Sequence, residues 1–313
     1  MKNILITGGA GFIANELIRN LTTDPENYII VIDNLILGTE NNISKFKTNF
    51  EFIKGDVTDN DLLETLFDKY NFDLIYHFAA NSDISISFEN PNIDYINTFN
   101  TTWQLLNTMK KFNCKNLIFA STSAIFGELK GNISENDGPL NPISHYGAAK
   151  LASEAFISSF VHNYDFNVLI VRFPNVVGGN STHGVIYDFI NKLKSNNKEL
   201  IVLGNGKQEK SYLHVSDLIN AIFYCWSNKK ELLTVFNISG NDTISVKKIA
   251  EIVVEHISPG AKIIYTGTER GWKGDVTNFS YDNSKLLNSG WNFKYNSTDS
   301  VKLAVEENIK HDN

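Results

Sequence analysis

Two side chains that together could move a proton stand four residues apart in HYGAAK, residues 145–150. A tyrosine phenol can act as a general acid or base, and a nearby lysine ammonium can stabilise the phenolate. If the segment is helical, Tyr146 and Lys150 share one face. The spacing alone carries little weight, because about one such pair is expected by chance in a chain with 12 Tyr and many Lys. Tyr281 and Lys285 form a second pair with the same spacing.

A glycine-rich turn near the N-terminus could bind a phosphate-containing cofactor. TGGAGFIA, residues 7–14, follows an apolar run and opens a helix-like stretch. Gly8 permits a tight turn, Gly11 lets backbone amides approach a pyrophosphate, and Ala14 is small enough for helix–strand packing. Asp33 ends the second apolar run, 22 residues beyond Gly11, where a carboxylate binds the adenosine ribose and repels a 2′-phosphate. No Arg stands near residue 34, so the pattern predicts NAD rather than NADP.

The elements that must position these groups alternate along the first half of the chain. Continuous Ile/Leu/Val runs indicate strands buried on both faces, and the stretches between them are typical of crossover helices. This order predicts an α/β fold, a Rossmann-type doubly wound parallel sheet with right-handed crossovers. The predicted strands are 2–7, 28–33, 50–56, 73–79, 116–121 and 168–173, and the predicted helices are 11–21, 60–69, 91–112 and 145–163.

After residue 175 the alternation loosens, which indicates a smaller C-terminal α/β lobe. We therefore divide the chain into a cofactor-binding Rossmann domain at 1–176, with returning segments near 212–241, and a second lobe at 177–313. The elements predicted there are helices 184–195, 216–227 and 245–256, strands 199–203 and 234–238, and a loop at 204–217.

Seven short motifs follow one another along the chain: TGGAGFIA (7–14), IDN (32–34), GDV (55–57), HFAA (77–80), STSAIFG (121–127), YGAAK (146–150) and RFPN (172–175). Their order and approximate spacing resemble those of the extended short-chain dehydrogenase/reductase family, the NAD-dependent nucleotide-sugar epimerases and dehydratases. The resemblance covers nearly the whole chain. It implies NAD as cofactor, a nucleoside-diphosphate sugar as substrate, and a nucleotide-sugar-binding role for the lobe at 177–313.

The resemblance also implies which residues hold the cofactor. Asp56 and Val57 would lie beside the adenine, and residues 78–80 along the pyrophosphate and the nicotinamide riboside. The complete predicted set is Gly8, Gly11, Phe12, Ile13, Asp33, Asn34, Asp56, Val57, Phe78, Ala79, Ala80, Tyr146 and Lys150.

By the same resemblance, Thr122, Tyr146 and Lys150 are the catalytic residues. Thr122 would hydrogen-bond the sugar hydroxyl that is oxidised, and Tyr146 would remove its proton as hydride passes to the nicotinamide. A free tyrosine has a pKa of about 10, so Lys150 and the positive nicotinamide would have to favour the phenolate. Lys150 would also hold the ribose. The pair Tyr281 and Lys285 has no such companions, and we predict a solvated helix start there.

The residues after Thr122 limit the reaction. The 4,6-dehydratases of this family resemble one another in carrying one or two acids at this point, because removing water needs an acid and a base. This chain has Ser123 and Ala124 there. The sequence therefore disfavours a 4,6-dehydratase.

Substrate contacts are implied in the second lobe as well. Asn175 matches the family residue that contacts the substrate diphosphate. Lys210 precedes YLHV, where family members commonly carry Arg, and Arg270 flanks a position before Gly-Asp-Val where Arg is usual. Arg172 is expected to brace the end of its strand. The predicted substrate-binding residues are Thr122, Ser123, Asn175, Lys210 and Arg270.

Composition excludes several classes of partner and ligand for this protein. A net charge of −7 without a basic tract argues against nucleic acid. Cys114 and Cys225 are isolated from each other and from other metal-ligating residues, so we predict neither a disulfide framework nor a metal site. No apolar run approaches the ~20 residues of a membrane span, and glycines interrupt the apolar N-terminal stretch. We expect a cytoplasmic protein that does not bind membranes.

The sequence thus predicts NAD-dependent oxidation of the C4 hydroxyl of a nucleoside-diphosphate sugar to a 4-keto sugar, for a surface polysaccharide. In a 4-dehydrogenase the keto sugar leaves; in a 4-epimerase it takes hydride back on its other face. Overall likeness favours the GDP-heptose 4-dehydrogenase-type members of capsule pathways, with a UDP-hexose 4-epimerase as the alternative. A non-catalytic NAD-binding module is the competing class, but the three catalytic positions are all present in register.

The resemblance also implies a homodimer. Helices 91–112 and 145–163 are those that commonly pair across a two-fold axis in this family. Phe99, Trp103, Phe156 and Phe160 could supply an apolar seam between subunits or be buried within one subunit.

Overall fold

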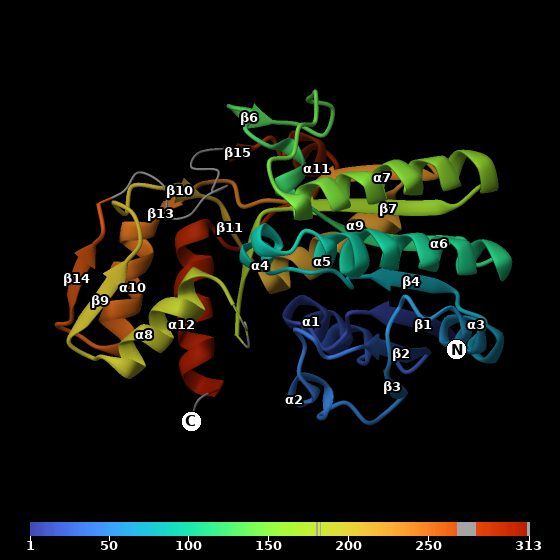
Figure 1. The fold of residues 1–313 in the computed structure, drawn as a ribbon, viewed down its shortest axis with the longest axis horizontal. Coiled ribbons are helices and arrows are strands. Elements are labelled where there is room, and N and C mark those ends of the chain that lie inside the picture. The colour runs from blue at the N-terminus through green and yellow to red at the C-terminus, as the bar shows by residue number, and fades with distance from the viewer. Residues whose placement is uncertain (180, 182, 268–279, 312–313) are drawn as a thin grey trace. The chain divides into compact units, whose positions relative to one another are not determined.

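The computed structural model describes residues 1–179, 181, 183–267 and 280–311, and the chain divides into two compact units (Figure 1). Unit 1 comprises Met1–Gly127, Pro139–Arg172 and Ile222–Phe236. Unit 2 comprises Glu128–Gly138, Phe173–Ala221 and Asn237–Asn313. The chain therefore returns to unit 1 after residue 221, and a short insertion at residues 128–138, which the sequence did not reveal, belongs to unit 2.

A seven-stranded sheet forms the centre of unit 1. The strand order is β12-β7-β5-β4-β1-β2-β3, and the pairs β1–β2, β1–β4, β2–β3 and β4–β5 are parallel. The order reverses between β1 and β4, which is where a doubly wound sheet binds its ligand. The strands are β1 (Lys2–Thr7), β2 (Asn27–Asp33), β3 (Phe50–Lys54), β4 (Leu74–His77), β5 (Asn116–Thr122), β7 (Asn167–Phe173) and β12 (Leu233–Asn237).

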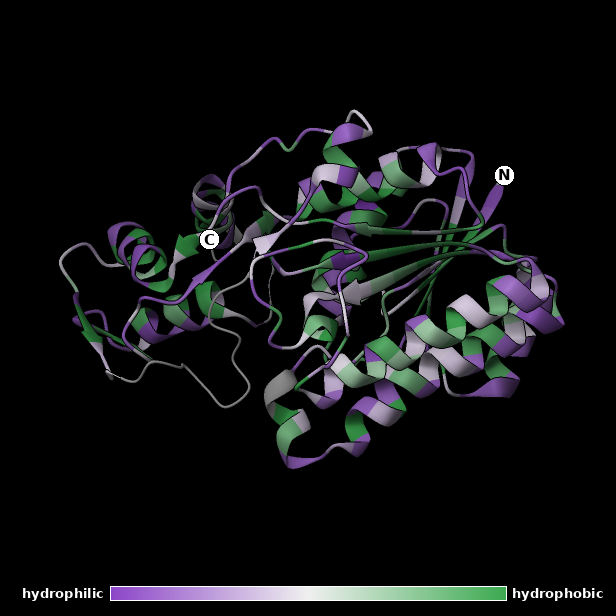
Figure 2. Ribbon diagram, turned by 90° about the horizontal axis from the view of Figure 1, so that it is seen from above, coloured by the Kyte–Doolittle hydropathy of each residue, from purple (hydrophilic) through white to green (hydrophobic). Residues whose placement is uncertain are grey.

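Apolar side chains on both faces of the strands explain why this sheet is buried. Leu5, Ile30 and Ile32 join one core cluster with residues of α3, α6 and α7, whereas the alternate residues Ile6 and Val31 point to the opposite face and are fully buried. Figure 2 shows these strands as predominantly hydrophobic ribbons. The prediction of a doubly wound α/β sheet is confirmed.

The helices predicted within residues 1–176 begin and end close to their predicted positions, with one exception, and two further short helices, at 40–43 and 84–89, were not predicted. The helices are α1 (Phe12–Leu21), α2 (Glu40–Ile43), α3 (Asn60–Tyr70), α4 (Ile84–Glu89), α6 (Thr101–Lys111) and α7 (His145–Tyr164). The single helix predicted at 91–112 is instead α5 (Asn92–Asp94), a π-helical turn η1 (Tyr95–Asn100), and then α6. Apolar periodicity identifies a helix but does not detect a widened turn.

Unit 2 is built from short paired strands and a helical core. The helices α8 (Val185–Ser195), α10 (Val246–Ile257) and α12 (Ser297–His311) surround one apolar cluster, and α9 (Val215–Asn228) continues from unit 2 into unit 1. The remaining elements are β6 (Asn132–Ile133), β8 (Asn175–Val177), β9 (Glu199–Val202), β10 (Glu209–Lys210), β11 (Tyr212–His214), β13 (Ile244–Ser245), β14 (Lys262–Tyr265), β15 (Ser280–Tyr281) and α11 (Ser284–Asn288).

Two sequence-based expectations need correction, and for Phe160 the structure decides between the two alternatives that the sequence left open. The predicted loop at 204–217 contains β10 and β11, because these residues pair with β13 and β8. Tyr281 is not part of a solvated helix start: it lies in β15, pairs with Ile133 and is 5 % exposed. Phe160 is 5 % exposed within the core of unit 1, so it does not contribute to a surface seam.

None of the helices in the described ranges is long and apolar enough to cross a membrane. Within the same residues, no group of three or more His, Cys, Asp or Glu side chains is placed to hold a metal ion. Cys114 and Cys225 are both buried and not bonded to each other.

Candidate active site

The turn between β1 and α1 requires its glycines. Gly8 has a φ of +70°, and a Cβ there would lie 2.6 Å from the backbone nitrogen of Ala79. The Gly11 N–H donates to the Gly8 carbonyl over 3.2 Å, which closes the turn. Sequence reasoning missed Gly9, where a Cβ would lie 2.3 Å from a methyl carbon of Val31. That contact depends on how β1 and β2 pair, which the motif itself does not contain.

The N-terminus of α1 is suited to an anion. No side chain caps this helix, whereas Asp59 caps α3 and Ser144 caps α7 through bonds to backbone amides. The first-turn amides, which include those of Phe12 and Ile13, lie at the positive end of the helix dipole. A pyrophosphate would satisfy them, so this turn fits the NAD that the sequence predicts.

Asp33 fixes the glycine turn to the end of β2. Its carboxylate accepts hydrogen bonds from the backbone N–H groups of Ala10 (3.0 Å) and Leu35 (2.7 Å). Burial raises the pKa of this carboxyl, and the two backbone hydrogen bonds partly offset that rise. The carboxylate therefore lies at the end of β2 beside the glycine turn, and its contact with the ribose stays a prediction.

Asp56 and Asn34 form a second polar contact at the same end of the sheet. Asn34 donates to Asp56 over 2.8 Å, and Thr58 donates to the other carboxylate oxygen through its amide and its hydroxyl. Burial raises the pKa of Asp56, but the hydrogen bonds from Thr58 and Asn34 outweigh it and hold the pKa below its usual range. Val57 beside it is buried, so the predicted adenine-side residues form one ordered segment.

The segment after β4 is held by a buried histidine that the sequence did not single out. His77 is fully buried between the hydroxyls of Thr7 (2.6 Å) and Thr102 (3.0 Å). Burial lowers its pKa to about 3, assisted by the charge of Lys150, so the ring is neutral. The Ala79 amide donates to the same Thr7 hydroxyl (3.2 Å), which places the predicted residues Phe78, Ala79 and Ala80, all partly exposed, beside Gly8.

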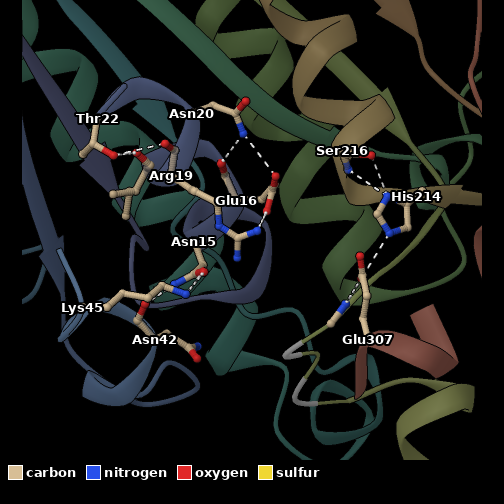
Figure 3. Close-up of polar contacts among 12 residues, drawn as sticks. Asn15, Glu16, Arg19, Asn20, Thr22, Asn42, Lys45, His214, Ser216 and Glu307 are labelled. Carbon is tan, nitrogen blue, oxygen red and sulfur yellow. Dashed lines mark hydrogen bonds and ion pairs between the residues drawn. The ribbon is translucent and has the colours of Figure 1, made fainter. Parts of the chain in front are cut away.

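Figure 3 shows a further polar group that supports the glycine turn from α1. Lys45 donates to the Asn15 side chain over 3.1 Å, and the Asn42 side chain donates to the Ala10 carbonyl over 2.8 Å. The Asn15 amide in turn donates to the Asn42 carbonyl. The chain following β2 is thereby tied to the turn, a link that no local pattern predicts.

Thr122, Tyr146 and Lys150 meet where β5 ends and α7 begins. Thr122 is the last residue of β5, and its hydroxyl accepts a hydrogen bond from the Ala124 amide (3.2 Å) at the start of the 3₁₀ turn η2 (Ser123–Phe126). Lys150 donates to the Ala120 carbonyl over 2.6 Å. Gly147 allows this approach, because a Cβ there would lie 2.5 Å from the Ala124 carbonyl oxygen.

Burial dominates the protonation of the two residues on α7. It raises the pKa of Tyr146 to about 12, against the lowering effect of a hydrogen bond with Thr122, while the charge of Asp94 raises it further. It lowers the pKa of Lys150 to about 7, against the raising effects of Glu154 and Asp94. The predicted catalytic residues are thus brought together, with Thr122 bonded to Tyr146.

A buried ion pair between Arg172 and Glu154 lies next to these residues. The sequence predicted a structural role for Arg172 but did not identify Glu154. Arg172 donates to Glu154 from Nε to Oε1 (3.0 Å) and Oε2 (3.2 Å) and from an NH2 nitrogen to Oε2 (2.6 Å). The Ser121 hydroxyl also donates to Glu154. The predicted bracing role of Arg172 is confirmed. Glu154 was missed, although its position one helical turn after Lys150 was a usable signal.

The predicted substrate residues are divided between the two units. Ser123 opens η2 in unit 1. In unit 2, Asn175 begins β8 and donates to the Ser211 carbonyl over 3.2 Å, and Lys210 ends β10 next to that serine. Arg270 lies outside the described residues. Within unit 2 the structure therefore brings Asn175 close to the 210–211 segment.

The chain after β8 is held by α12, which sequence reasoning did not predict. Glu307 accepts a hydrogen bond from the Gly179 amide (2.7 Å) and lies 3.3 Å from His214 Nε2, as Figure 3 shows. Asn308 donates to the Gly178 carbonyl over 3.0 Å. These contacts fix the exit from the strand that carries Asn175.

Comparisons with known proteins agree with this geometry. The family model described as "NAD dependent epimerase/dehydratase family" matches residues 4–239. The chain is 31% identical to a putative UDP-glucose 4-epimerase of Methanocaldococcus jannaschii, covering 96% of this chain and 97% of that one. It is 29% identical to dTDP-D-glucose 4,6-dehydratase of Mus musculus, covering 97% and 88%.

A similar solved structure is that of UDP-glucuronic acid 4-epimerase from Bacillus cereus in complex with UDP-glucuronic acid and NAD. The two chains share 25% identity with a TM-score of 0.88, over 99% of this chain and 100% of that one.

Proposed function

Because the chain belongs to the NAD-dependent epimerase/dehydratase family, an NAD-dependent family of nucleotide-sugar enzymes, we propose that it oxidises the C4 hydroxyl of a nucleoside-diphosphate sugar to a 4-keto sugar. One observation carries the proposal: Thr122, Tyr146 and Lys150 lie together in the same unit as the glycine turn and Asp33. NAD, when bound, supplies the hydride acceptor and a positive charge beside the phenol.

The chain's own residues account for the proton transfer. Tyr146, at a pKa of about 12, is a poor base by itself, so a nearby positive charge is needed to favour the phenolate. The Lys150 ammonium, held by the Ala120 carbonyl, is one source of that charge. Thr122 shares a hydrogen bond with Tyr146 and orients a substrate hydroxyl toward it. The proton then passes from the sugar C4 hydroxyl to the Tyr146 oxygen.

Two fates of the keto sugar share these steps. Re-reduction on the opposite face gives a 4-epimerase, and the similarity of the whole chain to 4-epimerases favours this outcome. Release of the keto sugar gives a 4-dehydrogenase. The overall likeness of the sequence to GDP-heptose 4-dehydrogenase-type enzymes of surface-polysaccharide pathways favours this second outcome. A 4,6-dehydratase is not proposed despite the dehydratase relatives, because Ser123 and Ala124 provide no acid after Thr122.

The test is to incubate the full chain and NAD with UDP-, GDP- and dTDP-sugars, including a GDP-heptose. NMR of the sugar detects an epimer or a keto product, and absorbance detects NADH. An epimer without net NADH supports the 4-epimerase, whereas a keto sugar with equal NADH supports the 4-dehydrogenase. If no sugar yields either product while NAD still binds, the proposal fails and a non-catalytic NAD-binding role is favoured.

Tyr146→Phe provides the sharper check, and the chain contains its own control. The variant should lower kcat by about 10²-fold or more, because the base is lost, while NAD affinity is retained. Tyr281→Phe removes the hydroxyl of the other Tyr–Lys pair, in β15 of unit 2, and should keep wild-type turnover. Equal turnover in both variants would contradict the role of Tyr146.

A further inference from the structure

A buried carboxylate lies beside the start of α7 without a full set of partners. Asp94 is 1 % exposed and ends α5, which contacts α7 (Figure 1). Its Oδ1 accepts a hydrogen bond from Asn81 Nδ2 over 3.0 Å. Its buried Oδ2 receives none from the part of the chain that the structure describes. Leaving a buried carboxylate oxygen unpaired is costly, so Asp94 calls for a positively charged partner.

The Lys150 ammonium is also buried, and it makes fewer hydrogen bonds than its three protons allow. It is 2 % exposed, and its Nζ donates to the Ala120 carbonyl and lies 4.7 Å from the centre of the Phe119 ring. An ammonium has three protons to donate, and the described contacts of Nζ include this single hydrogen bond. A buried ammonium therefore stands in the same region with donor capacity left.

The other carboxylate near Lys150 already has a cation of its own. Glu154 lies one helical turn further along α7, but both of its oxygens bond to the Arg172 guanidinium. Its negative charge is therefore largely balanced by Arg172. Asp94 is the second carboxylate, after Glu154, whose charge raises the pKa of Lys150, and within the described residues its side chain contacts no cation of its own.

The backbone around Asp94 holds it in place. Asp94 immediately precedes the π-helical turn η1, and such turns frequently occur at functional sites. Asn81 connects the residue before this turn to a residue within it, because its side chain donates to Asp94 and its backbone N–H donates to the Thr98 hydroxyl over 3.1 Å. The position of the carboxylate is thus set from outside its own helix.

We propose that Asp94 is a positioning residue, a buried counter-charge that, together with Glu154, keeps Lys150 an ammonium near neutral pH and so prepares the Tyr146–Lys150 pair. Its catalytic consequence rests on the proposed function. Within the described residues, the charged or titratable groups that act on Tyr146 and Lys150 include Glu154 on α7, Asp94 on α5, His77 on β4, and Arg172 on β7 through its pair with Glu154.

The charge of Asp94 changes the pKa of Tyr146 and the pKa of Lys150 in the same direction. The charge of Asp94 raises the pKa of Lys150 and that of Tyr146. Neutralising Asp94 should therefore lower both, and the pair should lose its first proton at a lower pH. Loss of an opposite charge in a buried site corresponds to a shift of about one pH unit. The acid limb of the pH–kcat profile should therefore shift to lower pH by the same amount.

The experiment measures Lys150 directly in the full chain. The protein is labelled with 13C-lysine, and the Cε signal of Lys150 is assigned by its absence in Lys150→Arg. In wild type this signal should titrate with a midpoint near the Lys150 pKa of about 7. Asp94→Asn keeps the size of the side chain and an oxygen for Asn81, and should lower the midpoint by about one pH unit.

The matched control is Ser87→Ala. Ser87 is 1 % exposed and its hydroxyl accepts a hydrogen bond from the same Asn81 amide at 3.0 Å, so the variant removes a neutral partner and no charge. Its Lys150 midpoint should equal that of wild type. Equal midpoints in Asp94→Asn and wild type, or equal shifts in both variants, would overturn the proposal.

Asp94→Ser is a second neutral variant should the asparagine disturb folding. If both neutral variants lose the fold in circular dichroism while Ser87→Ala keeps it, the role of Asp94 is purely structural and the proposal is overturned. The Lys150 titration needs no turnover. Absence of activity in wild type would therefore remove the proposed function without deciding the role of Asp94.

Discussion

Single buried charges have the largest consequences at the residue scale. Arg172 and Glu154 bond to each other with both side chains only 7 % exposed, so neither could be solvated if the other were removed. Lys150 is held in a similarly enclosed place by a neutral carbonyl. The stability of unit 1 should therefore respond to these residues far more than to the charges on its surface.

Arg172→Met should lower the free energy of unfolding by about 3–5 kcal/mol, because Glu154 is left charged and buried. Lys248→Met breaks the exposed pair with Glu251, whose side chains are 54% and 42% exposed, and should cost about 0–1 kcal/mol. Urea unfolding followed by circular dichroism measures both. Equal losses in the two variants would contradict the argument from burial.

Lys150→Met should reveal the cost of burying this ammonium through its pH dependence. In the unfolded chain the Lys150 proton is held up to about pH 10.4, whereas in the folded chain the pKa is about 7. Between these values the unfolded state binds more protons, so raising the pH stabilises the wild type. The stability of Lys150→Met relative to wild type should thus fall steadily from pH 7 to pH 9.5 in urea titrations; a constant difference would refute the lowered pKa.

Only some residues of the candidate site could be identified from the sequence. Tyr146, Lys150 and Thr122 were identified because they belong to motifs of fixed spacing, and Arg172 because it lies next to the end of a strand. Asp94 was not identified, because its relation to Lys150 depends on a π-helical turn that brings a distant helix beside α7. Local spacing contains no information about such contacts.

At the scale of elements, the glycine turn is rigidly specified. Gly8→Ala would place a Cβ 2.6 Å from the Ala79 nitrogen at a φ of +70°, which forces β1 and the segment after β4 apart. We expect NAD affinity to fall about tenfold or more, measured by calorimetry. Gly260→Ala is the control: its φ is +98° but nothing lies within 4 Å, so it should cost about 1–2 kcal/mol of stability and leave NAD affinity unchanged.

Strands and long helices of unit 1 were predictable because each is marked by a continuous or periodic apolar run. The predicted strand at 28–33 is observed at Asn27–Asp33, and the predicted helix at 145–163 at His145–Tyr164. In unit 2 the strand predicted at 199–203 is observed as β9, but the other strands of this unit were not predicted. β8 and β11 have three residues each and exist through their pairing with each other, which is decided by contacts distant in sequence.

At the scale of the whole molecule, we propose a homodimer formed through the η1 and α7 surface of unit 1. Phe156 packs on Phe99 with ring centres 5.4 Å apart and on Trp103 at 5.1 Å, yet it remains 38% exposed. Tyr95 and Ile96 beside it are 59% and 46% exposed. A contiguous group of exposed apolar side chains is typical of a protein interface.

Light scattering should therefore find a dimer, and Phe156→Glu should convert it to a monomer with unchanged circular dichroism, because a charge would be buried in the interface. Tyr187→Glu replaces an aromatic residue with a similar exposure, 40%, on α8 of unit 2, and should remain dimeric. A monomeric wild type under the same conditions would contradict the proposed interface.

The path of the chain through its two units constrains how the protein can be made. Unit 1 begins at residue 1 but is completed by Ile222–Phe236, which carries the edge strand β12. During synthesis from the N-terminus, β7 is therefore a bare sheet edge until β12 has left the ribosome, and such edges recruit other chains. The sheet stays unfinished while the 59 residues between Phe173 and Leu233 are synthesised, so this is the interval in which a chaperone would protect the β7 edge.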